Sequence, residues 1–279
     1  MEISNEYNLK ELLFAAIKSS LHAGKVILEV YNAGNFQVKL KSDNSPLTQA
    51  DKKAHKKIVS LLKKTDLPIL SEEGKEIPYK VREKWRYFWL VDPLDGTKEF
   101  IKRNGEFTVN IALIHKNKPI LGVIYIPVIE ELYFSLDKIG AYKINKITLA
   151  KVHRLNIDEL INMGMQLPIN QRKKKFTIVG SRSHMTKNTE EFIAKLQEKY
   201  GDVEMIFKGS SLKFCLMAEG LADIYPRFSP TMEWDTAAGH AIALGAGLKV
   251  IKHDKTNLLE YNKKNLLNPW FIVILNPYR

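Results

Sequence analysis

The segment Trp89-Leu90-Val91-Asp92-Pro93-Leu94-Asp95-Gly96-Thr97-Lys98-Glu99-Phe100 carries the strongest pattern in this sequence. The apolar run from Phe88 to Val91 predicts a buried strand that ends at a carboxylate followed by a proline. Asp92 and Asp95 are three residues apart, and Pro93 restricts the backbone between them, so both carboxylates can turn toward one point. Two converging carboxylates suit a hard divalent cation such as Mg²⁺. The alternative is an ordinary Asp-Pro-x-Asp-Gly turn.

Gly96 and Thr97 follow directly and offer backbone N–H groups and a hydroxyl, which could bind an anion held by that cation. Other acidic residues stand at similar places in the chain. Asp51 falls in the first turn of a predicted helix, where it is also favourable for the helix dipole. Glu72 and Glu73 follow a short predicted strand, where adjacent acids are commonly just solvated.

Length and composition indicate a soluble protein of two packed halves. The chain has 279 residues, of which 45% are hydrophobic and 27% charged. Cys215 is the only cysteine, so a reducing cytoplasm fits, and the first residues lack the basic-then-apolar order of a signal peptide. The net charge of +12 comes from lysines scattered through the chain, with one basic run at 172–175.

Hydrophobic periodicity predicts helices stacked on a largely antiparallel sheet in the first half. The expected elements are an amphipathic helix at 8–31, an edge strand at 36–40, a helix from 48, strands at 68–71 and 88–91, a hairpin of 108–114 and 120–126 with a turn of generous length, and short strands at 132–135 and 141–144. Residues 155–175 lack a clear period, so we expect the domains to be 1–152 and 153–279.

The second half alternates strands and helices, which predicts an α/β layer. The expected strands are 176–179, 203–207, 222–225, 248–251 and 271–275, and the expected helices are 190–200, 211–218 and 234–244. Ligands of such layers bind beyond strand ends and at helix N-termini. Three stretches have that placement, namely 180–184, 209–213 and 234–239. The alternative interpretations are, in the same order, a polar loop, a helix cap made by a serine and an aspartate favoured by the helix dipole.

Asp92-Pro93-Leu94-Asp95-Gly96-Thr97, with a distant Trp234-Asp235-Thr236-Ala237-Ala238-Gly239, resembles the paired signatures of the inositol monophosphatase-like family of metal-dependent, lithium-sensitive phosphatases. Further motifs resemble its bacterial 3′(2′),5′-bisphosphate nucleotidase branch. They are Asp43-Asn44-Ser45-Pro46, Leu70-Ser71-Glu72-Glu73, the segment 98–107, Ser181-Arg182-Ser183-His184, the segment 209–215 and Tyr225-Pro226-Arg227-Phe228. The resemblance spans nearly the whole chain and implies a layered αβαβα sandwich, with an α+β first half and an α/β second half.

The resemblance also implies a metal site for two to three Mg²⁺ ions. Its ligands would be Glu72, Asp92, Asp95, Asp235 and the backbone carbonyl of Leu94. Crowded carboxylates do repel one another strongly unless cations neutralise them. The family resemblance further implies that Thr97 orients a metal-bound water and that Asp51 accepts its proton. The reaction would be phosphomonoester hydrolysis, in which Mg²⁺ activates water and stabilises the leaving alkoxide.

The substrate implied by the resemblance is adenosine 3′,5′-bisphosphate, a by-product of sulfate activation, which would yield AMP and phosphate. Its sulfated relative, 3′-phosphoadenylyl sulfate, is a second candidate. Arg227 and Lys213 are the expected ligands of the second phosphate, since arginine can bind it bidentately. Ser181 and His184 are expected at the ribose or the base. The expected substrate contacts are Gly96, Thr97, Ser181, His184, Ser210, Lys213 and Arg227.

Two alternatives stay open at this point. The chain could hydrolyse inositol phosphate or another sugar monophosphate on the same scaffold. It could instead be a non-catalytic basic protein that binds nucleic acid or a membrane surface, with a steep salt dependence and no need for Mg²⁺. We expect no nucleic-acid partner, because the single basic run carries no aromatic ladder. We expect a cytoplasmic location, and the basic surface is compatible with peripheral contact with an anionic inner membrane. The oligomeric state is left open.

Overall fold

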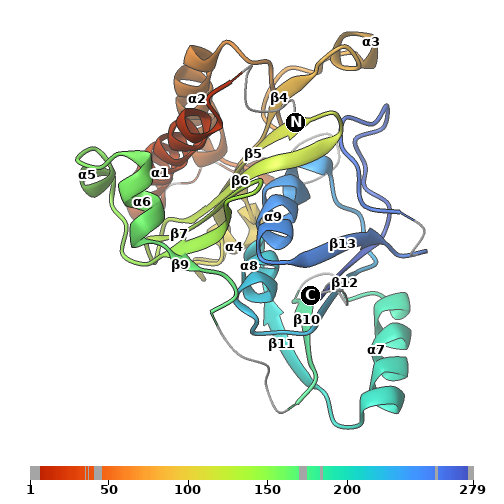
Figure 1. Ribbon diagram of the computed structural model, residues 1–279. Coiled ribbons are helices and arrows are strands. Elements are labelled where there is room, and N and C mark those ends of the chain that lie inside the picture. The colour runs from red at the N-terminus through yellow and green to blue at the C-terminus, as the bar shows by residue number, and fades with distance from the viewer. Residues whose placement is uncertain are drawn as a thin grey trace.

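The computed structural model describes residues 7–34, 36, 38–40, 46–169, 175–182, 185–254 and 257–275. Helices, a large sheet, helices, a smaller sheet and a last helix follow one another in layers (Figure 1). This order confirms the αβαβα sandwich that the sequence predicted.

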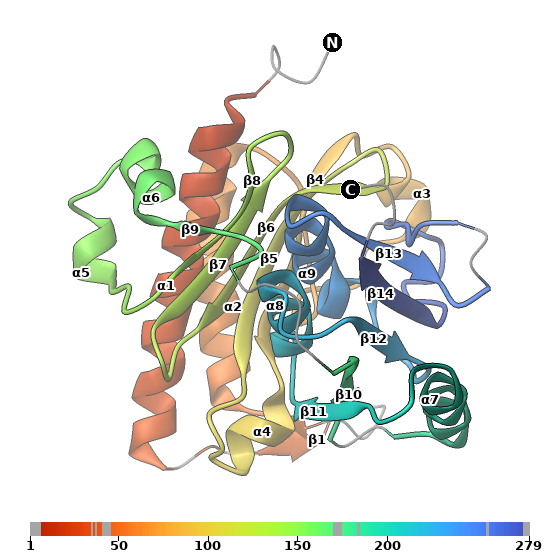
Figure 2. The same cartoon turned by 60° about the horizontal axis from the view of Figure 1, so that its bottom comes forward.

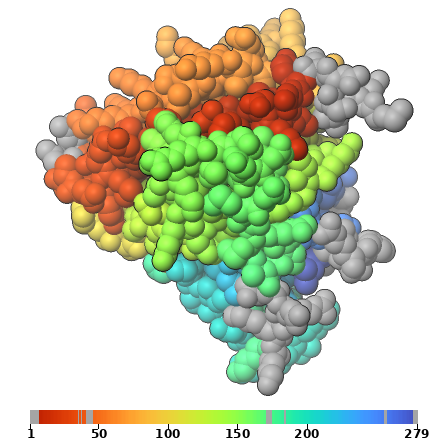
Figure 3. Space-filling model, turned by 60° about the vertical axis from the view of Figure 1, so that its left-hand side comes forward, coloured from red at the N-terminus to blue at the C-terminus, as the bar shows by residue number. Residues whose placement is uncertain are grey.

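The first layer covers one face of the large sheet. Its main helices are α1 (Leu9–Ala33) and α2 (Gln49–Leu62). The short helices α5 (Leu149–Val152) and α6 (Ile157–Met163) pack beside α1 in the same layer. Asn8 caps α1 by accepting a hydrogen bond from the Glu11 N–H, and the apolar stripe of each long helix is buried against the sheet. Figure 3 shows these helices, in red, orange and green, as one continuous outer face.

The large sheet has seven strands in the order β3-β4-β5-β6-β7-β8-β9. Only β3 and β4 are parallel, and every other neighbouring pair is antiparallel, as expected. The strands are β3 (Ile69–Ser71), β4 (Tyr87–Asp95), β5 (Thr108–His115), β6 (Lys118–Ile126), β7 (Glu131–Leu136), β8 (Gly140–Ile144) and β9 (Met165–Gln166). Short helices η1 (Lys63–Thr65), α3 (Tyr79–Arg82) and α4 (Thr97–Ile101) lie in the connections.

Two local expectations for the first half were wrong. The turn of the β5–β6 hairpin is short, because the strands extend to His115 and Lys118 and leave only Lys116 and Asn117 between them. Both turn residues have positive φ, of 46° and 67°, as a tight two-residue hairpin requires. The strand expected at 36–40 is no edge of the large sheet. Its described part, β1 (Lys39–Leu40), pairs with β2 (Pro46–Leu47) in a separate two-stranded ribbon.

The second half forms the remaining layers. Helices α8 (Leu212–Glu219) and α9 (Glu233–Gly245) lie between the two sheets (Figure 2). The smaller sheet has the order β11-β10-β12-β14-β13. Strands β10, β11 and β12 are parallel, and β14 is antiparallel to both of its neighbours, β12 and β13. Its strands are β10 (Thr177–Ser181), β11 (Glu204–Lys208), β12 (Ile224–Arg227), β13 (Leu248–Lys252) and β14 (Phe271–Leu275), and α7 (Lys187–Tyr200) covers its outer face.

The region without a clear period has more structure than expected. Helices α5 and α6 and strand β9 all fall near it, and Ile157 and Leu160 of α6 are buried in the core of the first half. The division of the chain at residues 152 and 153 stays a prediction, and the sheets themselves change between Gln166 and Thr177.

The central helix α9 lies unusually close to the large sheet. A Cβ atom at Gly122 of β6 would come within 2.4 Å of the Ala238 carbonyl oxygen and 2.8 Å of Ala241 Cβ. A larger residue at 122 would therefore push α9 away from the sheet. Within the described residues, no helix has both the length and the apolar character that a membrane span requires.

Candidate active site

The end of β4 departs from regular strand geometry. The sequence predicted that the strand would break at Asp92, but it continues to Asp95 through a β-bulge. Asp92 pairs with Asn110 and Asp95 pairs with Thr108, so three steps along β4 match two steps along β5. In a regular strand, residues three apart point to opposite faces. The bulge supplies the extra residue that brings both aspartates to the same face.

Asp95 connects the two halves of the chain. Its Oδ2 accepts hydrogen bonds from the Ser210 hydroxyl and the Ser211 N–H, both at 2.7 Å, and from Asn110 Nδ2 at 3.2 Å. These bonds all go to one oxygen, so Oδ1 is the oxygen that a cation could bind. Gly96 follows with φ of 91°, and a Cβ there would lie 3.1 Å from the Glu106 carbonyl oxygen. Glycine therefore lets the chain turn into α4 beside the second half.

Asp51 and Thr97 meet as the sequence predicted. The Thr97 hydroxyl lies 3.2 Å from Asp51 Oδ1 and 3.4 Å from the Leu94 carbonyl oxygen. The other oxygen of Asp51 caps α2, because it accepts the Thr48 N–H at 2.7 Å and the Thr48 hydroxyl at 2.5 Å. Burial raises the pKa of Asp51, although the hydrogen bonds from Thr48 oppose this shift. Asp51 therefore caps α2 with one carboxylate oxygen and accepts a hydrogen bond from Thr97 with the other.

One cavity of about 260 Å³ gathers most of the predicted residues. Its wall includes the predicted metal ligands Glu72, Asp92, Leu94, Asp95 and Asp235, and the predicted substrate contacts Gly96, Thr97, Ser181, Ser210, Lys213 and Arg227. Glu72 follows β3, and Asp235 lies in the first turn of α9, where its Oδ2 accepts the Met232 N–H at 2.9 Å. Asp51 reaches the site through Thr97. His184 and residues 43–45 lie outside the described residues.

The acidic residues of this cavity destabilise one another's charges. Burial, followed by repulsion from Glu72, Asp95 and Asp235, raises the pKa of Asp92 well above its ordinary value. A hydrogen bond with Glu72 raises the pKa of Asp92 further. Burial together with repulsion from Asp95 and Glu72 raises the pKa of Asp235 to about 8. Such a group of carboxylates is stable when ionised only if positive charge lies among them.

The donor set therefore fits Mg²⁺ in its chemistry, since it consists of carboxylate and carbonyl oxygens. One oxygen each of Asp92, Asp95 and Asp235 is fixed by a protein donor, which orients the carboxylate before any cation binds. Within the described part of the chain, no group of three or more acidic, histidine or cysteine side chains already has the arrangement of a closed metal site. The fit thus depends on donor type and mutual repulsion.

Two buried basic side chains, Lys213 and Arg227, also line the cavity, and we call them its basic wall. Lys213, which is buried, donates to the carbonyl oxygens of Ser210 at 2.5 Å and Lys208 at 3.3 Å. Burial and then the charge of Arg227 lower the pKa of Lys213 to about 8. Arg227 is 8% exposed and donates from Nη2 to the Pro230 carbonyl oxygen at 3.2 Å. Its Nε has no hydrogen-bond partner among the described residues.

Several residues of the site were missed by the sequence analysis. Thr108 and Asn110 of β5 bind the Ser210–Ser211 turn, with the Thr108 hydroxyl 2.7 Å from the Ser210 hydroxyl. Polar side chains two residues apart in an otherwise apolar strand were the available signal. Glu106 accepts hydrogen bonds from the Gly209 N–H at 2.9 Å and from Lys208 Nζ at 3.1 Å. Ser210, predicted as a substrate contact, thus also orients Asp95.

Comparisons with known proteins agree with this geometry. Residues 8–272 match the sequence model of the Inositol monophosphatase family. The 3′(2′),5′-bisphosphate nucleotidase CysQ of Salmonella typhimurium is 43% identical over 259 residues, which cover 91% of this chain and 96% of that protein. The protein of the same name from Escherichia coli (strain K12) is 44% identical over 257 residues, covering 90% and 95%.

A solved structure has the same architecture. The crystal structure of CysQ from Bacteroides thetaiotaomicron, described as a bacterial member of the inositol monophosphatase family, superposes with a TM-score of 0.90 at 52% identity. The match covers 96% of this chain and 99% of that one. Sequence and structure therefore agree that the chain belongs to the inositol monophosphatase family.

Proposed function

We propose that this protein is a Mg²⁺-dependent 3′(2′),5′-bisphosphate nucleotidase that hydrolyses adenosine 3′,5′-bisphosphate to AMP and phosphate. The observation that carries this proposal is the position of Arg227. Arg227 is more than nine-tenths buried and lines the cavity that holds the four predicted carboxylate ligands, and its Nε has no hydrogen-bond partner among the described residues. A buried, incompletely paired guanidinium is suited to an anion.

A bisphosphate matches both walls of the cavity. The reacting phosphate would lie at the carboxylate wall together with the cations, and the second phosphate would lie against Lys213 and Arg227. Binding there would compensate two positive charges that burial makes unfavourable. Relatives at 43% and 44% identity bear the name of this activity, which supports the proposal. Sulfated 3′-phosphoadenylyl sulfate has the same two anionic ends and is a second candidate substrate.

Glu72, Asp92, Asp95, Asp235 and the Leu94 carbonyl would hold two to three Mg²⁺ ions. When bound, these ions would lower the pKa of water, neutralise the phosphoryl oxygens and stabilise the leaving alkoxide. Such a transfer depends mainly on positioning and on charge neutralisation.

Thr97 and Asp51 would move the proton. The Thr97 hydroxyl donates to Asp51 Oδ1 at 3.2 Å, so its own oxygen can accept a proton from the attacking water. As the water oxygen attacks phosphorus, the water proton passes to Thr97 and the Thr97 proton passes to Asp51. The bond from phosphorus to the ribose oxygen breaks, and the leaving alkoxide takes up a proton from a solvent water molecule, which balances the proton held by Asp51. The raised pKa of Asp51 brings this base closer to neutral pH, where proton transfer is most effective.

The alternatives explain less of the cavity. An inositol or sugar monophosphate carries only one phosphate, so with that phosphate among the cations it would bring no second anion to Lys213 and Arg227. A non-catalytic basic protein would gain nothing from five carboxylates in one cavity, since they would repel a polyanion. The cytoplasmic location stays a prediction from the single cysteine.

The test is the release of phosphate with Mg²⁺ from adenosine 3′,5′-bisphosphate, inositol 1-phosphate and AMP. A strong preference for the bisphosphate supports the proposal, and lithium should then inhibit at Mg²⁺ concentrations that sustain turnover. Preference for inositol 1-phosphate would retain the cation site and contradict the role of the basic wall. Release from none of the three, together with salt-sensitive binding of polyanions, would favour the binding-protein alternative.

A further inference from the structure

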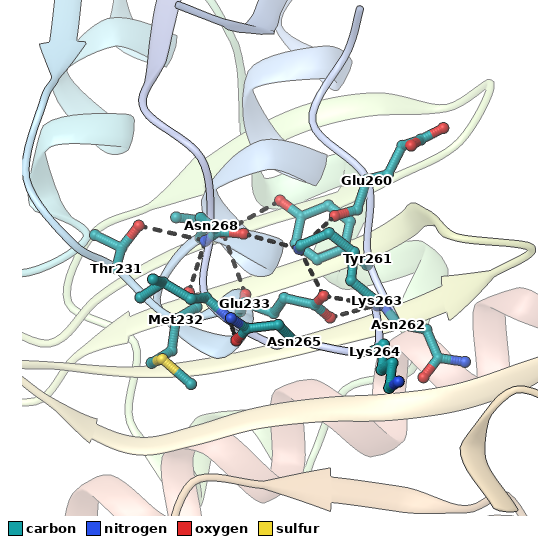
Figure 4. A network of polar contacts seen from close by, with 12 residues as sticks. Thr231, Met232, Glu233, Glu260, Tyr261, Asn262, Lys263, Lys264, Asn265 and Asn268 are labelled. Atoms are coloured by element: carbon teal, nitrogen blue, oxygen red, sulfur yellow. Dashed lines mark hydrogen bonds and ion pairs between the residues drawn. The ribbon is translucent and has the colours of Figure 1, made fainter. Parts of the chain in front are cut away.

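A second buried carboxylate lies two residues before Asp235, in the same turn of α9. Glu233 is fully buried, yet the cavity is lined by Asp235 and Thr236 of this turn and not by Glu233. Its carboxylate points toward the chain segment that precedes β14 (Figure 4). Glu233 therefore touches neither the cation site nor the substrate.

The partners of Glu233 are two successive residues of that segment. Oε2 accepts the Asn262 N–H at 2.6 Å, and Oε1 accepts the Lys263 N–H at 2.9 Å and Lys263 Nζ at 2.6 Å. Asn262 has a positive φ of 64°, which turns the two neighbouring N–H groups toward the same carboxylate. Consecutive N–H groups of this kind form a concave anion site, and here a side chain of the protein occupies it.

The same segment is attached to the first half by a buried arginine. Arg82 of α3, which is 3% exposed, donates from Nη1 to Asn262 Oδ1 at 2.8 Å and to the Lys263 carbonyl oxygen at 3.2 Å. The Asn262 amide donates back to the Arg82 carbonyl oxygen at 2.8 Å. Arg82 belongs to the connection that begins with Glu72 and leads into β4. The segment thus links the chain next to one predicted ligand with the helix that carries another.

Asn268 closes this arrangement around the start of α9. Its Nδ2 donates to the Met232 carbonyl oxygen at 2.8 Å and to the Thr236 hydroxyl at 3.0 Å, and its backbone N–H donates to the Thr231 carbonyl oxygen at 2.8 Å. Figure 4 shows these side chains converging on the first turn of the helix. The residues on either side of Glu233 are therefore held as firmly as Glu233 itself.

We propose that Glu233 is the positioning residue of Asp235, fixing the first turn of α9 to the Asn262–Lys263 segment and so setting the Asp235 carboxylate opposite Glu72 and Asp92. This inference deepens the proposed function and depends on its cation site. The role requires a carboxylate, because all three partners are donors and an amide has only one acceptor oxygen. Loss of the role should weaken cation binding without any change to a cation ligand.

Glu233→Gln is the test variant, and Glu219→Gln is its matched control. Glu219 is also a buried glutamate with a lysine partner, accepting Tyr133 Oη at 2.6 Å and Lys143 Nζ at 3.2 Å, but it lies at the far end of α8 and does not line the cavity. Binding of Mg²⁺ to the full chain is measured by titration calorimetry without substrate, and unfolding by urea is measured in parallel. Both variants should lose stability, but only Glu233→Gln should bind Mg²⁺ about tenfold more weakly or worse.

Activity gives an independent readout. In Glu233→Gln the Mg²⁺ concentration for half-maximal turnover should rise by the same factor as in calorimetry, while KM for the bisphosphate at saturating Mg²⁺ stays close to that of the unmodified protein. Unchanged Mg²⁺ affinity in Glu233→Gln, or an equal loss in Glu219→Gln, would overturn the positioning role. If the unmodified protein binds Mg²⁺ but releases no phosphate, the proposed function fails and calorimetry still decides the role of Glu233.

A milder variant covers the case in which Glu233→Gln does not fold. Lys263→Gln removes the ammonium partner and retains both backbone N–H donors to Glu233. We expect a smaller loss of Mg²⁺ affinity in the same direction, by a factor of a few. An affinity equal to that of the unmodified protein in a folded Lys263→Gln chain would contradict the proposal.

Discussion

The acidic wall of the cavity, formed by Glu72, Asp92, Asp95 and Asp235, and its basic wall, formed by Lys213 and Arg227, differ in how the protein pairs their charged groups. On the acidic wall, Asp92, Asp95 and Asp235 each have an oxygen fixed by an N–H or O–H donor of the protein. On the basic wall, Lys213 donates only to backbone carbonyl oxygens, and Arg227 keeps Nε without a partner among the described residues. The carboxylates of the acidic wall are therefore oriented in advance, whereas Lys213 on the basic wall has Asp95, Glu99 and Glu106 nearby as counter-charges but no carboxylate among its hydrogen-bond acceptors in the described part of the chain.

This difference indicates that the two walls have separate roles in the proposed reaction. Changes on the acidic wall should affect the rate of the reaction and the requirement for Mg²⁺. Changes on the basic wall should affect the affinity for a substrate with two phosphates and leave other substrates nearly unaffected. Variants on each side can therefore separate chemistry from recognition.

The largest effect is expected for Asp95→Asn on the acidic wall. The amide has no negative charge and only one acceptor oxygen. If that oxygen accepts from Ser210, Ser211 and Asn110, no oxygen is left to bind a cation. Turnover should be abolished at Mg²⁺ concentrations that saturate the unmodified protein, as measured by phosphate release over a Mg²⁺ series. Asp158→Asn, at an exposed position on α6, is the matched control and should be nearly silent. Near-normal activity of Asp95→Asn would contradict the assignment of a cation site to this wall.

Thr97→Ala should have the next largest effect. The loss of the hydroxyl breaks the connection between water and Asp51 Oδ1, so kcat should fall by about 10²–10⁴-fold, the usual contribution of positioned proton transfer. KM should change little, and Thr97→Ser should restore most of the rate because it retains the hydroxyl. Steady-state kinetics distinguish the cases. A loss confined to KM would place Thr97 in substrate binding only.

Arg227→Gln should change recognition on the basic wall. Removing the guanidinium should raise KM for adenosine 3′,5′-bisphosphate by about tenfold to a hundredfold, which is the value of a hydrogen bond between charged groups. Hydrolysis of any monophosphate that the protein accepts should change far less. Arg154→Gln, on the exposed surface, is the control. Equal losses on both kinds of substrate would contradict the division between the walls.

The smallest effect concerns pH and Lys213. Its pKa in the folded protein is about 8, below the ordinary value of 10.5, so the ammonium is present below pH 8 and is lost as the pH rises through that value. KM for the bisphosphate should therefore increase a fewfold above pH 8, relative to KM for a monophosphate measured in the same samples. Lys213→Met should flatten this ratio. A ratio that is constant across pH 7–9 would show that Lys213 does not bind the second phosphate.

The same shift has a consequence for stability. Between pH 8 and 10.5 the unfolded chain binds a proton at Lys213 that the folded chain has already released. The contribution of Lys213 to the free energy of unfolding should therefore rise with pH across that window. Urea unfolding of the unmodified protein and of Lys213→Met at both ends of the window measures the difference.

Much of the fold could be predicted from the sequence because the long elements have strong periodicity. Helices α1 and α2 each present one apolar stripe, and strands β10 to β13 of the smaller sheet alternate with helices α7, α8 and α9. The elements near residues 149–166 were missed, since α5 spans only four residues and β9 only two. Elements this short are held by tertiary packing, such as burial of Leu160, and their own sequence carries too few residues to show a period.

The sequence named residues that line the candidate site, but it did not predict their geometry. Motif spacing singled out Asp92 and Asp95, the family resemblance added Asp235, and all three line one cavity. The bulge that turns Asp92 and Asp95 to one face depends on the register with β5, which lies in a different part of the chain. Glu233 was missed for a related reason, because its partners Asn262 and Lys263 lie in an irregular segment without any pattern. Pairing between distant segments is not encoded in a local pattern.

The bonds that complete this site join residues far apart in the chain. Asp95 and Ser211 are separated by 116 positions, and Arg82 and Asn262 by 180. During synthesis the N-terminal part of a protein emerges and begins to fold first. The helix that bears Asp235 cannot be held in place until residues near 268 have left the ribosome. A growing chain therefore carries the aspartates of β4 before their partners exist, and the proposed cation site can be complete only after residues near 268 have emerged.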